Sequence, residues 1–310
     1  MFLRKAISAI AAVGLMACSG SFLQAADTEP LVFRFNPPDS ISFTVDIRSD
    51  RTRWIDSTES PVDSSVSTVR RTIRRSGSGW SMTSRPTSIV TTSGGRATDN
   101  PINRILLAAK ATSVLDSSGV VTSVSGYDGI PHAIDSLASG PMAGRLKEML
   151  SPTNLSAKEE MEWNGKIQGL HGKPVRIGYI EYEKAEYPLP GGAHIPFLVA
   201  IRVVDTVRFN GKLHAVLLMS ADSDPNKIAE RLNRPSDEIA LEFPISDSPG
   251  MAIIKGGSRY MSESEIILEI TTLLPYSEKS GREIRLRGEP GSGPQRIRMV
   301  EHETRQYKYH

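Results

Sequence analysis

Apolar and polar residues alternate with a period of two over much of this 310-residue chain. In residues 41–47, for example, every second residue is Ile, Phe or Val. Successive side chains of a β-strand point to opposite faces, so this pattern predicts strands that bury one face. Gly, Pro, Asn and Asp interrupt the runs, as is typical of turns. The sequence therefore predicts a mainly β fold, a β-rich α+β class with antiparallel strands and few short helices.

The first strands are expected soon after residue 30. Alternate apolar residues in 31–35 point one way, Asn36-Pro37-Pro38-Asp39 predicts a turn, and residues 41–47 resume the alternation. These segments are expected to form a hairpin. Residues 56–67 are rich in Ser, Asp and Thr and are predicted to be a loop. Further strands are predicted at 66–73, 89–92, 113–115, 120–124, 253–260, 265–274, 283–287, 296–300 and 304–309.

The clearest hairpin signal is Asn210-Gly211 between two apolar-rich runs, residues 197–209 and 213–219. A two-residue turn would set polar residues opposite apolar ones, whereas a three-residue loop would pair apolar residues with each other. We therefore predict a bulged turn with Gly211 in the left-handed conformation. The pairs of this register are Val207 with Leu213, Val203 with Leu217 and Ile201 with Met219.

Few helices are expected. Asp224-Pro225 supplies a capping residue and a proline at the first helical position, which predicts a helix over 226–232. Residues 151–162 are polar and charged and favour a boundary between lobes. The chain is expected to form either one large β domain or two β-rich lobes. Two further helices are predicted at 130–137 and 142–150, and the two lobes would span residues 31–150 and 160–310.

The N-terminus has the pattern of an export signal. Arg4 and Lys5 precede an uncharged run, residues 6–17, that is shorter than the roughly 20 residues of a transmembrane helix. The run ends at Cys18, the only cysteine. This arrangement resembles the signal peptide and lipobox of bacterial lipoproteins. The resemblance implies that Cys18 becomes the first mature residue and bears acyl chains, palmitate among them, that anchor the exported protein to a membrane.

Two cleavage sites are consistent with this leader. Cleavage before Cys18 would make residues 1–17 the signal peptide and residues 18–30 a tether. By analogy with Gram-negative lipoproteins, Ser19 after the cysteine favours the outer membrane. Cleavage after Ala25 would instead remove residues 1–25 and release a soluble periplasmic or secreted protein.

Charge and cysteine content exclude some classes of protein. Loss of Arg4 and Lys5 with the leader leaves 35 basic and 35 acidic residues, so the mature protein is formally neutral. A neutral balance gives no reason to expect a nucleic-acid partner. A single cysteine cannot form an internal disulfide, and stability must come from packing.

Two further features are interpreted structurally. The basic residues 70–75 are predicted to lie on an edge strand that they protect from aggregation, with contact to an anionic headgroup as the alternative. Trp163 is expected in the core and not in a ligand platform.

No motif for catalysis, a metal or a cofactor is found. The six histidines form no zinc motif, and there is no Gly-x-Ser-x-Gly elbow. His302 lies between Glu301 and Glu303, but on a strand the two carboxylates would share one face and the imidazole would take the other. Adjacent acids such as Glu159 and Glu160 are typical of exposed surfaces and do not define a glycosidase pair. We therefore assign no catalytic, cofactor-binding or metal residue and predict that the protein is not an enzyme.

The segment after the leader, Leu31-Val-Phe-Arg-Phe-Asn-Pro-Pro-Asp-Ser-Ile-Ser-Phe-Thr-Val45, and the later series of strands are similar to bacterial envelope proteins with the lipoprotein-carrier (LolA-like) half-barrel. The resemblance implies a curved antiparallel sheet or half-barrel whose concave face holds a short helix or an acyl chain. We expect a non-catalytic cell-envelope lipoprotein that binds a hydrophobic ligand or a partner protein, with a continuous apolar concavity. The alternatives are an envelope glycan hydrolase and a purely structural or assembly protein.

Overall fold

The computed structural model describes residues 29–167, 170–188, 194–232, 257–287 and 296–310. Within it, Leu31–His310 form one compact unit. The predictions for the leader, for acylation of Cys18 and for cleavage after Ala25 fall on residues 1–28 and lie outside the described residues.

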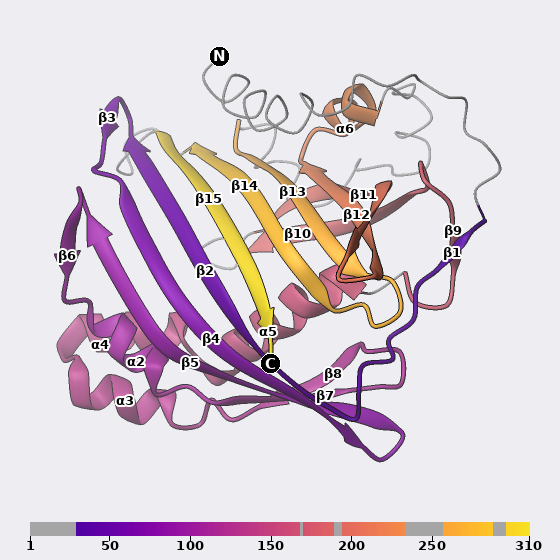
Figure 1. The fold of residues 1–310 in the computed structure, drawn as a ribbon. Coiled ribbons are helices and arrows are strands. Elements are labelled where there is room, and N and C mark those ends of the chain that lie inside the picture. Colours follow the sequence, from indigo (N-terminus) through magenta and orange to yellow (C-terminus); the bar gives the residue numbers. More distant parts are fainter. Residues whose placement is uncertain (1–28, 168–169, 189–193, 233–256, 288–295) are drawn as a thin grey trace. The chain divides into compact units, whose positions relative to one another are not determined.

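The compact unit is built on a 13-stranded antiparallel sheet (Figure 1). Its strands follow the order β10-β11-β12-β13-β14-β15-β2-β4-β5-β7-β8, while β3 pairs with β2 and β6 with β5. A two-stranded sheet pairs β1 with β9. The prediction of a mainly β, antiparallel fold is confirmed. The strands are β1 (Leu31–Val32), β2 (Ser40–Ile55), β3 (Thr58–Glu59), β4 (Asp63–Ser76), β5 (Gly79–Ser93), β6 (Arg96–Thr98), β7 (Ala111–Leu115), β8 (Val121–Ser125), β9 (Pro174–Val175), β10 (Ile180–Pro188), β11 (His194–Phe209), β12 (Lys212–Asp222), β13 (Arg259–Glu269), β14 (Pro275–Arg287) and β15 (Arg296–Tyr309).

The described helices are short except for one. The predicted helices at 130–137, 142–150 and 226–232 are confirmed, whereas two others were not predicted. Their bounds are α2 (Pro101–Leu107), α3 (Ile130–Leu137), α4 (Gly140–Met149), α5 (Pro152–Ile167) and α6 (Pro225–Leu232).

Strands from both predicted lobes belong to the same sheet. The C-terminal strand β15 pairs along its length with β2, so residues 31–150 and 160–310 share one hydrogen-bonded surface. The proposed boundary at 151–162 lies inside α5 except for Ser151, which precedes the helix. Its polar residues include acids that form ion pairs with the sheet, which explains why this helix has no apolar stripe in the sequence.

The expected hairpin of residues 31–47 does not form. β1 pairs with β9, and β2 pairs instead with β4 and β15. Phe33 and Phe35 follow β1 as irregular backbone and are buried in the main core. The backbone N–H of Phe35 donates to Nδ1 of His171 at 3.1 Å. These contacts satisfy the polar backbone of a segment that alternation alone identifies as a strand.

The β11–β12 hairpin confirms the predicted register only away from its turn. Asn210 and Gly211 have positive φ angles of 49° and 77° and form a two-residue turn, not the predicted three-residue loop. Two successive positive φ angles are what this tight turn requires, and Asn-Gly adopts them readily. A bulge between Val203 and Asp205 then absorbs the offset. Beyond the bulge, the predicted pairs are restored: Val203 with Leu217 and Ile201 with Met219.

The other strand predictions differ mainly at their ends. Residues 296–300 and 304–309 form the single strand β15, and the strand predicted at 265–274 ends at Glu269 in β13. The predicted loop at 56–67 contains β3 and the start of β4. Residues 253–256 lie outside the described part of the chain.

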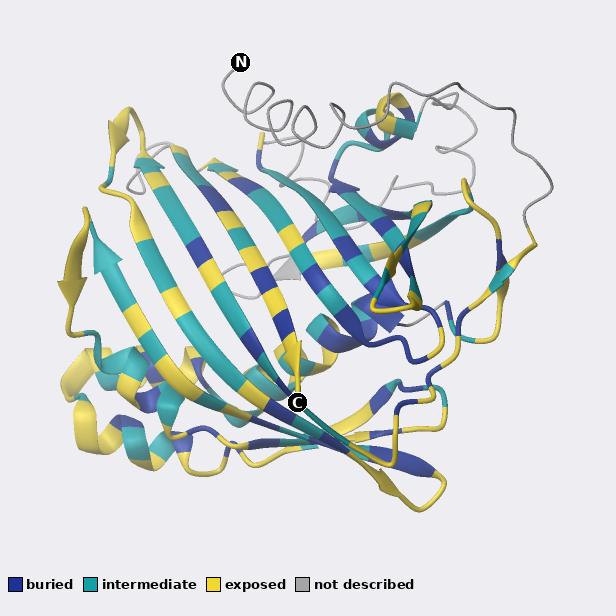
Figure 2. Ribbon diagram, in the orientation of Figure 1, coloured by how far each residue is buried: buried dark blue, intermediate teal, exposed yellow. Residues whose placement is uncertain are grey.

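Helix α5 packs on one face of the sheet, here called the inner face, and the opposite face is called the outer face (Figure 1). More buried and more exposed residues alternate along residues 301–308 of β15, as Figure 2 shows. The main core joins the inner face to α5 and to the segment after β1, and it includes Trp80, Trp163 and Phe35. The phenylalanine ring makes edge contacts with both tryptophans, at centroid distances of 5.8 and 6.4 Å.

Helix α5 also covers the edge of the sheet at β8. The backbone N–H of Val121 donates to Oδ1 of Asn164 at 2.7 Å, and Nδ2 of Asn164 donates to the carbonyl oxygen of Val121 at 3.0 Å. The buried side-chain amide thus takes the place of a peptide group on a missing neighbouring strand. An edge strand protected in this way cannot pair with another chain at this residue.

Asn164→Asp is expected to lower the free energy of unfolding by about 1–3 kcal/mol, because a buried carboxylate would face the Val121 carbonyl with no hydrogen to donate. Urea unfolding at neutral pH measures this loss. Asn154→Asp, on the exposed first turn of the same helix, serves as the control. Nδ2 of Asn154 also donates to a carbonyl oxygen, that of Glu148 at 2.8 Å, but water can replace this exposed hydrogen bond, so stability should change by less than about 0.5 kcal/mol. Equal losses in the two variants would contradict the role given to Asn164.

Candidate functional site

A network of ion pairs joins α5 to the inner face. Nη2 of Arg71 lies 2.9 Å from Oε1 of Glu159, and Nη1 of Arg305 lies 3.2 Å from Oε2 of Glu162. Lys166 reaches Oε2 of Glu278 at 2.6 Å. Ser84 also donates to Glu159, and Lys166 donates to the hydroxyl of Tyr307. The helix is therefore fixed by oppositely charged groups on three strands, β4, β14 and β15, and by a serine on a fourth, β5. These contacts specify its position along the sheet.

The network keeps its carboxylates ionised. Burial alone would raise the pKa of Glu162, but Arg305 and Lys158 outweigh it and lower the pKa to about 2. Burial also opposes ionisation of Glu278, and Lys166 with Arg305 lowers its pKa. For Arg305, burial lowers the pKa, yet the surrounding carboxylates raise it well above its usual value. Each of these groups is therefore charged at neutral pH because its oppositely charged neighbours stabilise the ionised form.

Beyond the residues that contact α5, two cross-strand rows continue over the inner face. Row A changes from apolar to hydroxyl-bearing to charged side chains as far as β15 and ends on a serine of β2. It comprises Ile201, Met219, Ser264, Ser280, Glu303 and Ser49 on β11, β12, β13, β14, β15 and β2. Row B follows the same order and comprises Val199, Ala221, Ser262, Arg282, Glu301 and Arg51. Most of these side chains are half-buried, so they retain contact with solvent.

Glu301 is the buried centre of row B. Its Oε1 accepts from Nη2 of Arg51 at 2.8 Å and from the hydroxyl of Ser49 at 3.0 Å, and its Oε2 pairs with Arg282. Burial raises the pKa of Glu301, but Arg282 and Arg51 lower it further than burial raises it. His302 is exposed on the outer face, so the predicted separation of His302 from its neighbouring acids is confirmed.

The inner face is therefore not the continuous apolar concavity expected from the sequence. Among the described residues, its main core is apolar beneath α5, but rows A and B are apolar only at β11 and β12, carry serine at β13, serine or arginine at β14, and glutamate at β15. Such a gradient matches an amphiphilic molecule better than a purely apolar one, because buried polar groups need polar partners.

The basic run at 70–75 is not at an edge of the sheet. β4 lies between β2 and β5, so the predicted edge-protecting role is wrong. Arg71 is buried on the inner face and pairs with Glu159, which corrects the expectation that Glu159 is an exposed acid. Arg75 stacks on Trp80 with its guanidinium carbon 4.9 Å from the ring centroid. Trp163 is 2% exposed in the core, as predicted.

No sequence motif marks the residues of rows A and B. Alternation shows that the side chains of Ser264, Ser280 and Glu303 each point to the opposite face of the strand from the residues before and after them. It does not show that these three residues come together. Their contact depends on strand order and register, which pair β13 with β14 and β14 with β15. The sequence signal that could have identified these rows is serine at strand positions where a buried apolar residue is expected.

Within the described segments, no group of three or more His, Cys, Asp or Glu side chains is arranged to hold a metal ion. Every helix in the described part of the chain is too short or too polar to span a bilayer.

No protein-family model and no curated protein matches the sequence. Among solved structures, the fold is similar to lipovitellin at 10% identity and a TM-score of 0.42, covering 89% of this chain and 25% of that chain. DynF from the dynemicin biosynthesis pathway of Micromonospora chersina matches at 10% identity and a TM-score of 0.20 over 93% of this chain and 92% of its own. OccK5 of Pseudomonas aeruginosa matches at 8% identity and a TM-score of 0.20, covering 88% of this chain and 98% of that chain.

This chain spans about a quarter of the lipovitellin chain that it matches. At these identities and TM-scores, the likenesses support no statement about ligand or activity. The structure itself defines the class as a mainly β protein with an open antiparallel sheet whose inner face is partly covered by one helix.

Proposed function

We propose that this protein is a non-catalytic, exported protein of the cell envelope that binds an amphiphilic ligand on rows A and B. The supporting observation is the order of side chains along row A. Apolar side chains of Ile201 and Met219 would contact the hydrocarbon part of the ligand, and the hydroxyls of Ser264 and Ser280 would bond to its polar part. The acyl anchor at Cys18 and an outer-membrane location complete the proposal.

The electrostatics of the inner face favour binding over catalysis. A glycosidase of the usual kind needs a general acid whose pKa is raised, so that the acid is protonated at neutral pH. Glu301 and Glu278 instead have lowered pKa values, because arginine or lysine contacts each carboxylate. These acids would remain ionised and would act as fixed charges.

Native mass spectrometry of the gently extracted, exported protein tests the proposal. The expected mass is that of a chain beginning at acylated Cys18, with an additional noncovalent lipid-sized adduct. Ser264→Trp should reduce the adduct at least about tenfold, because the large ring would occupy row A. Glu265→Trp, at the adjacent position on the outer face of β13, is the matched control and should retain the adduct.

The outcomes separate the parts of the proposal. A chain that begins at Ala26 would contradict the anchor, and absence of an adduct from the wild-type protein would contradict ligand binding. An adduct that survives Ser264→Trp but not Glu265→Trp would place the ligand on the outer face and overturn the assignment to row A.

A further inference from the structure

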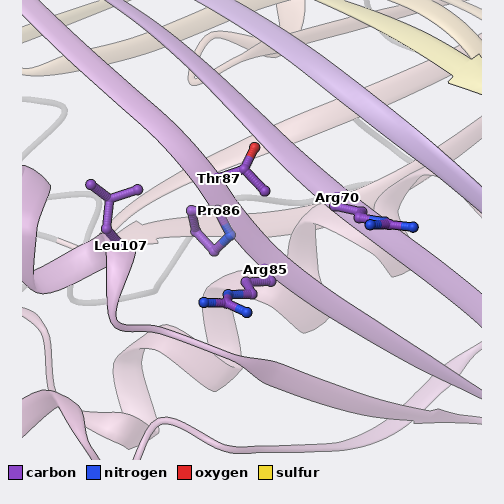
Figure 3. A pocket seen from close by; sticks show the side chains of 5 residues that line it. All are labelled: Arg70, Arg85, Pro86, Thr87 and Leu107. Atoms are coloured by element: carbon purple, nitrogen blue, oxygen red, sulfur yellow. The ribbon is translucent and has the colours of Figure 1, made fainter.

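An open pocket of about 440 Å³ is lined by Arg70, Arg85, Pro86, Thr87 and Leu107 (Figure 3). The two arginines are on the outer face, because their neighbours Arg71 and Ser84 point inward to Glu159. The pocket is therefore separate from rows A and B, and a ligand bound there would be independent of the proposed ligand of the inner face.

Arg70 on β4 and Arg85 on β5 are directly opposite each other in the sheet. Residues in this arrangement have Cβ atoms only about 5 Å apart, and like charges placed there repel. Both side chains are exposed. The guanidinium groups extend in opposite directions in Figure 3, as expected for two cations with no anion between them.

The acid in the adjoining row is already occupied. Oδ2 of Asp46 is 2.6 Å from Lys308, and its Oδ1 accepts from Thr68 at 3.0 Å. Lys308 and the hydroxyl of Thr68 together lower the pKa of Asp46 despite the opposing effect of burial, and they use both of its oxygens. Asp46 therefore does not neutralise the arginine pair.

The same sheet shows what a facing pair of arginines requires. Arg285 and Arg298 are also directly opposite each other, and Oε1 of Glu283 lies 2.7 and 2.6 Å from their Nε atoms. A carboxylate of the chain thus bridges two facing guanidinium groups there. In the described residues, no carboxylate of the chain occupies the equivalent position between Arg70 and Arg85.

The bulge next to the pair shapes the pocket. Thr68 pairs with Ser88 and Val69 with Pro86, so Thr87 is an additional residue in β5. Its hydroxyl donates to the carbonyl oxygen of Thr68 at 3.1 Å. Leu107 at the end of α2 adds an apolar rim. The pocket therefore combines two cations with apolar and hydroxyl groups.

We propose that Arg70 and Arg85 bind an oxyanion of the phosphate class, which bridges the two guanidinium groups as Glu283 bridges Arg285 and Arg298. Guanidinium groups suit this role because each can donate two parallel hydrogen bonds to phosphate oxygens. The phosphate would come either from a free anion or from an anionic lipid headgroup whose apolar portion meets Leu107.

Binding of inorganic phosphate to the purified mature protein, measured by isothermal titration calorimetry at constant ionic strength, tests the site. Arg70→Gln and Arg85→Gln are each expected to weaken binding at least about tenfold, since each removes a charge-assisted hydrogen bond. Arg74→Gln, on the outer face of the same strand, is the matched control and should bind as the wild-type protein does.

A second measurement keeps the test valid if a variant affects folding. Without phosphate, Arg70→Gln should melt at the same temperature as the wild-type protein or higher, because the substitution removes repulsion. With phosphate, the melting temperature should rise for the wild-type protein and not for this variant. A lower melting temperature without phosphate, or an equal rise with phosphate, would overturn the proposal.

The source of the phosphate is resolved with a soluble short-chain lipid. Dihexanoyl-phosphatidylglycerol below its micellar concentration should bind more tightly than inorganic phosphate if the site takes a headgroup, and equally or less tightly if it takes a free anion. Dihexanoyl-phosphatidylcholine, whose headgroup has no net charge, controls for binding of the acyl chains. Absence of binding by every probe would refute the site.

Discussion

Trp163→Ala is expected to lower the free energy of unfolding by about 3–5 kcal/mol, the usual cost of truncating a fully buried aromatic residue. Trp163 is 2% exposed, and its Nε1 donates to the carbonyl oxygen of Gly119 at 2.8 Å. Its ring also contacts Phe35 edge-on and lies beneath the guanidinium of Arg71. One side chain thus joins α5, the β7–β8 connection and the segment after β1.

Urea unfolding followed by circular dichroism measures this loss. Trp163→Phe should lose about 1–2 kcal/mol, because the ring packing is largely kept while the hydrogen bond to Gly119 is lost. Trp54→Ala is the matched control: this indole is half-buried, its Nε1 donates to the exposed Glu59 on β3, and truncation should lose at most about 1 kcal/mol. A loss at Trp163 no larger than at Trp54 would contradict the central position of α5.

Arg305→Met is expected to lower the free energy of unfolding by a similar amount, about 3–5 kcal/mol. Its guanidinium contacts Glu162, Glu278 and Glu303, and the side chain is 11% exposed. Removal of one partner from a buried ion pair leaves the other charge without compensation, which costs more than the pair itself contributes. Combining Arg305→Met with Glu162→Gln should therefore recover part of the loss.

The pH dependence of unfolding checks the same network. The pKa of Glu162 is about 2 in the folded protein and near 4.5 in the unfolded chain, so its contribution to stability is complete above about pH 4.5 and is lost as the pH falls toward 2. Arg305→Met should shift this loss to higher pH, because Arg305 is the main cation that lowers the pKa of Glu162. An unchanged acid limb in urea titrations between about pH 2 and pH 6 would contradict the assignment.

Local sequence patterns predicted individual strands well but not their neighbours. The alternation in residues 41–47 correctly identified part of β2, yet its partners are β4 and β15 and not residues 31–35. Pairing with β15 brings together residues more than 200 positions apart in the chain, and no local signal encodes such a contact. Likewise, Asn210-Gly211 predicted a turn at the correct place, but no local signal predicted the bulge between Val203 and Asp205 that restores the apolar pairs.

The polar helix α5 shows a second limit of pattern analysis. Residues 151–162 favour a boundary because they are polar and charged, although two of their acids, Glu159 and Glu162, face the sheet. A charge is buried only where an opposite charge is brought to it, and Arg71 and Arg305 come from distant strands. Arg70 belongs to the basic run at 70–75, whereas Arg85 lies outside that run and is placed opposite Arg70 only by the register of β4 and β5.

The amino-acid sequence by itself determined that this protein is mainly β, where most of its strands and three of its helices lie, and that Trp163 is in the core, because these properties depend on side-chain periodicity and local backbone preference. The tertiary structure alone decided the order of the strands, the burial of a charged helix, the polar gradient of rows A and B, and the facing arginines. Those properties arise from register between segments far apart in the chain, where a shift of one residue exchanges the two faces of a strand.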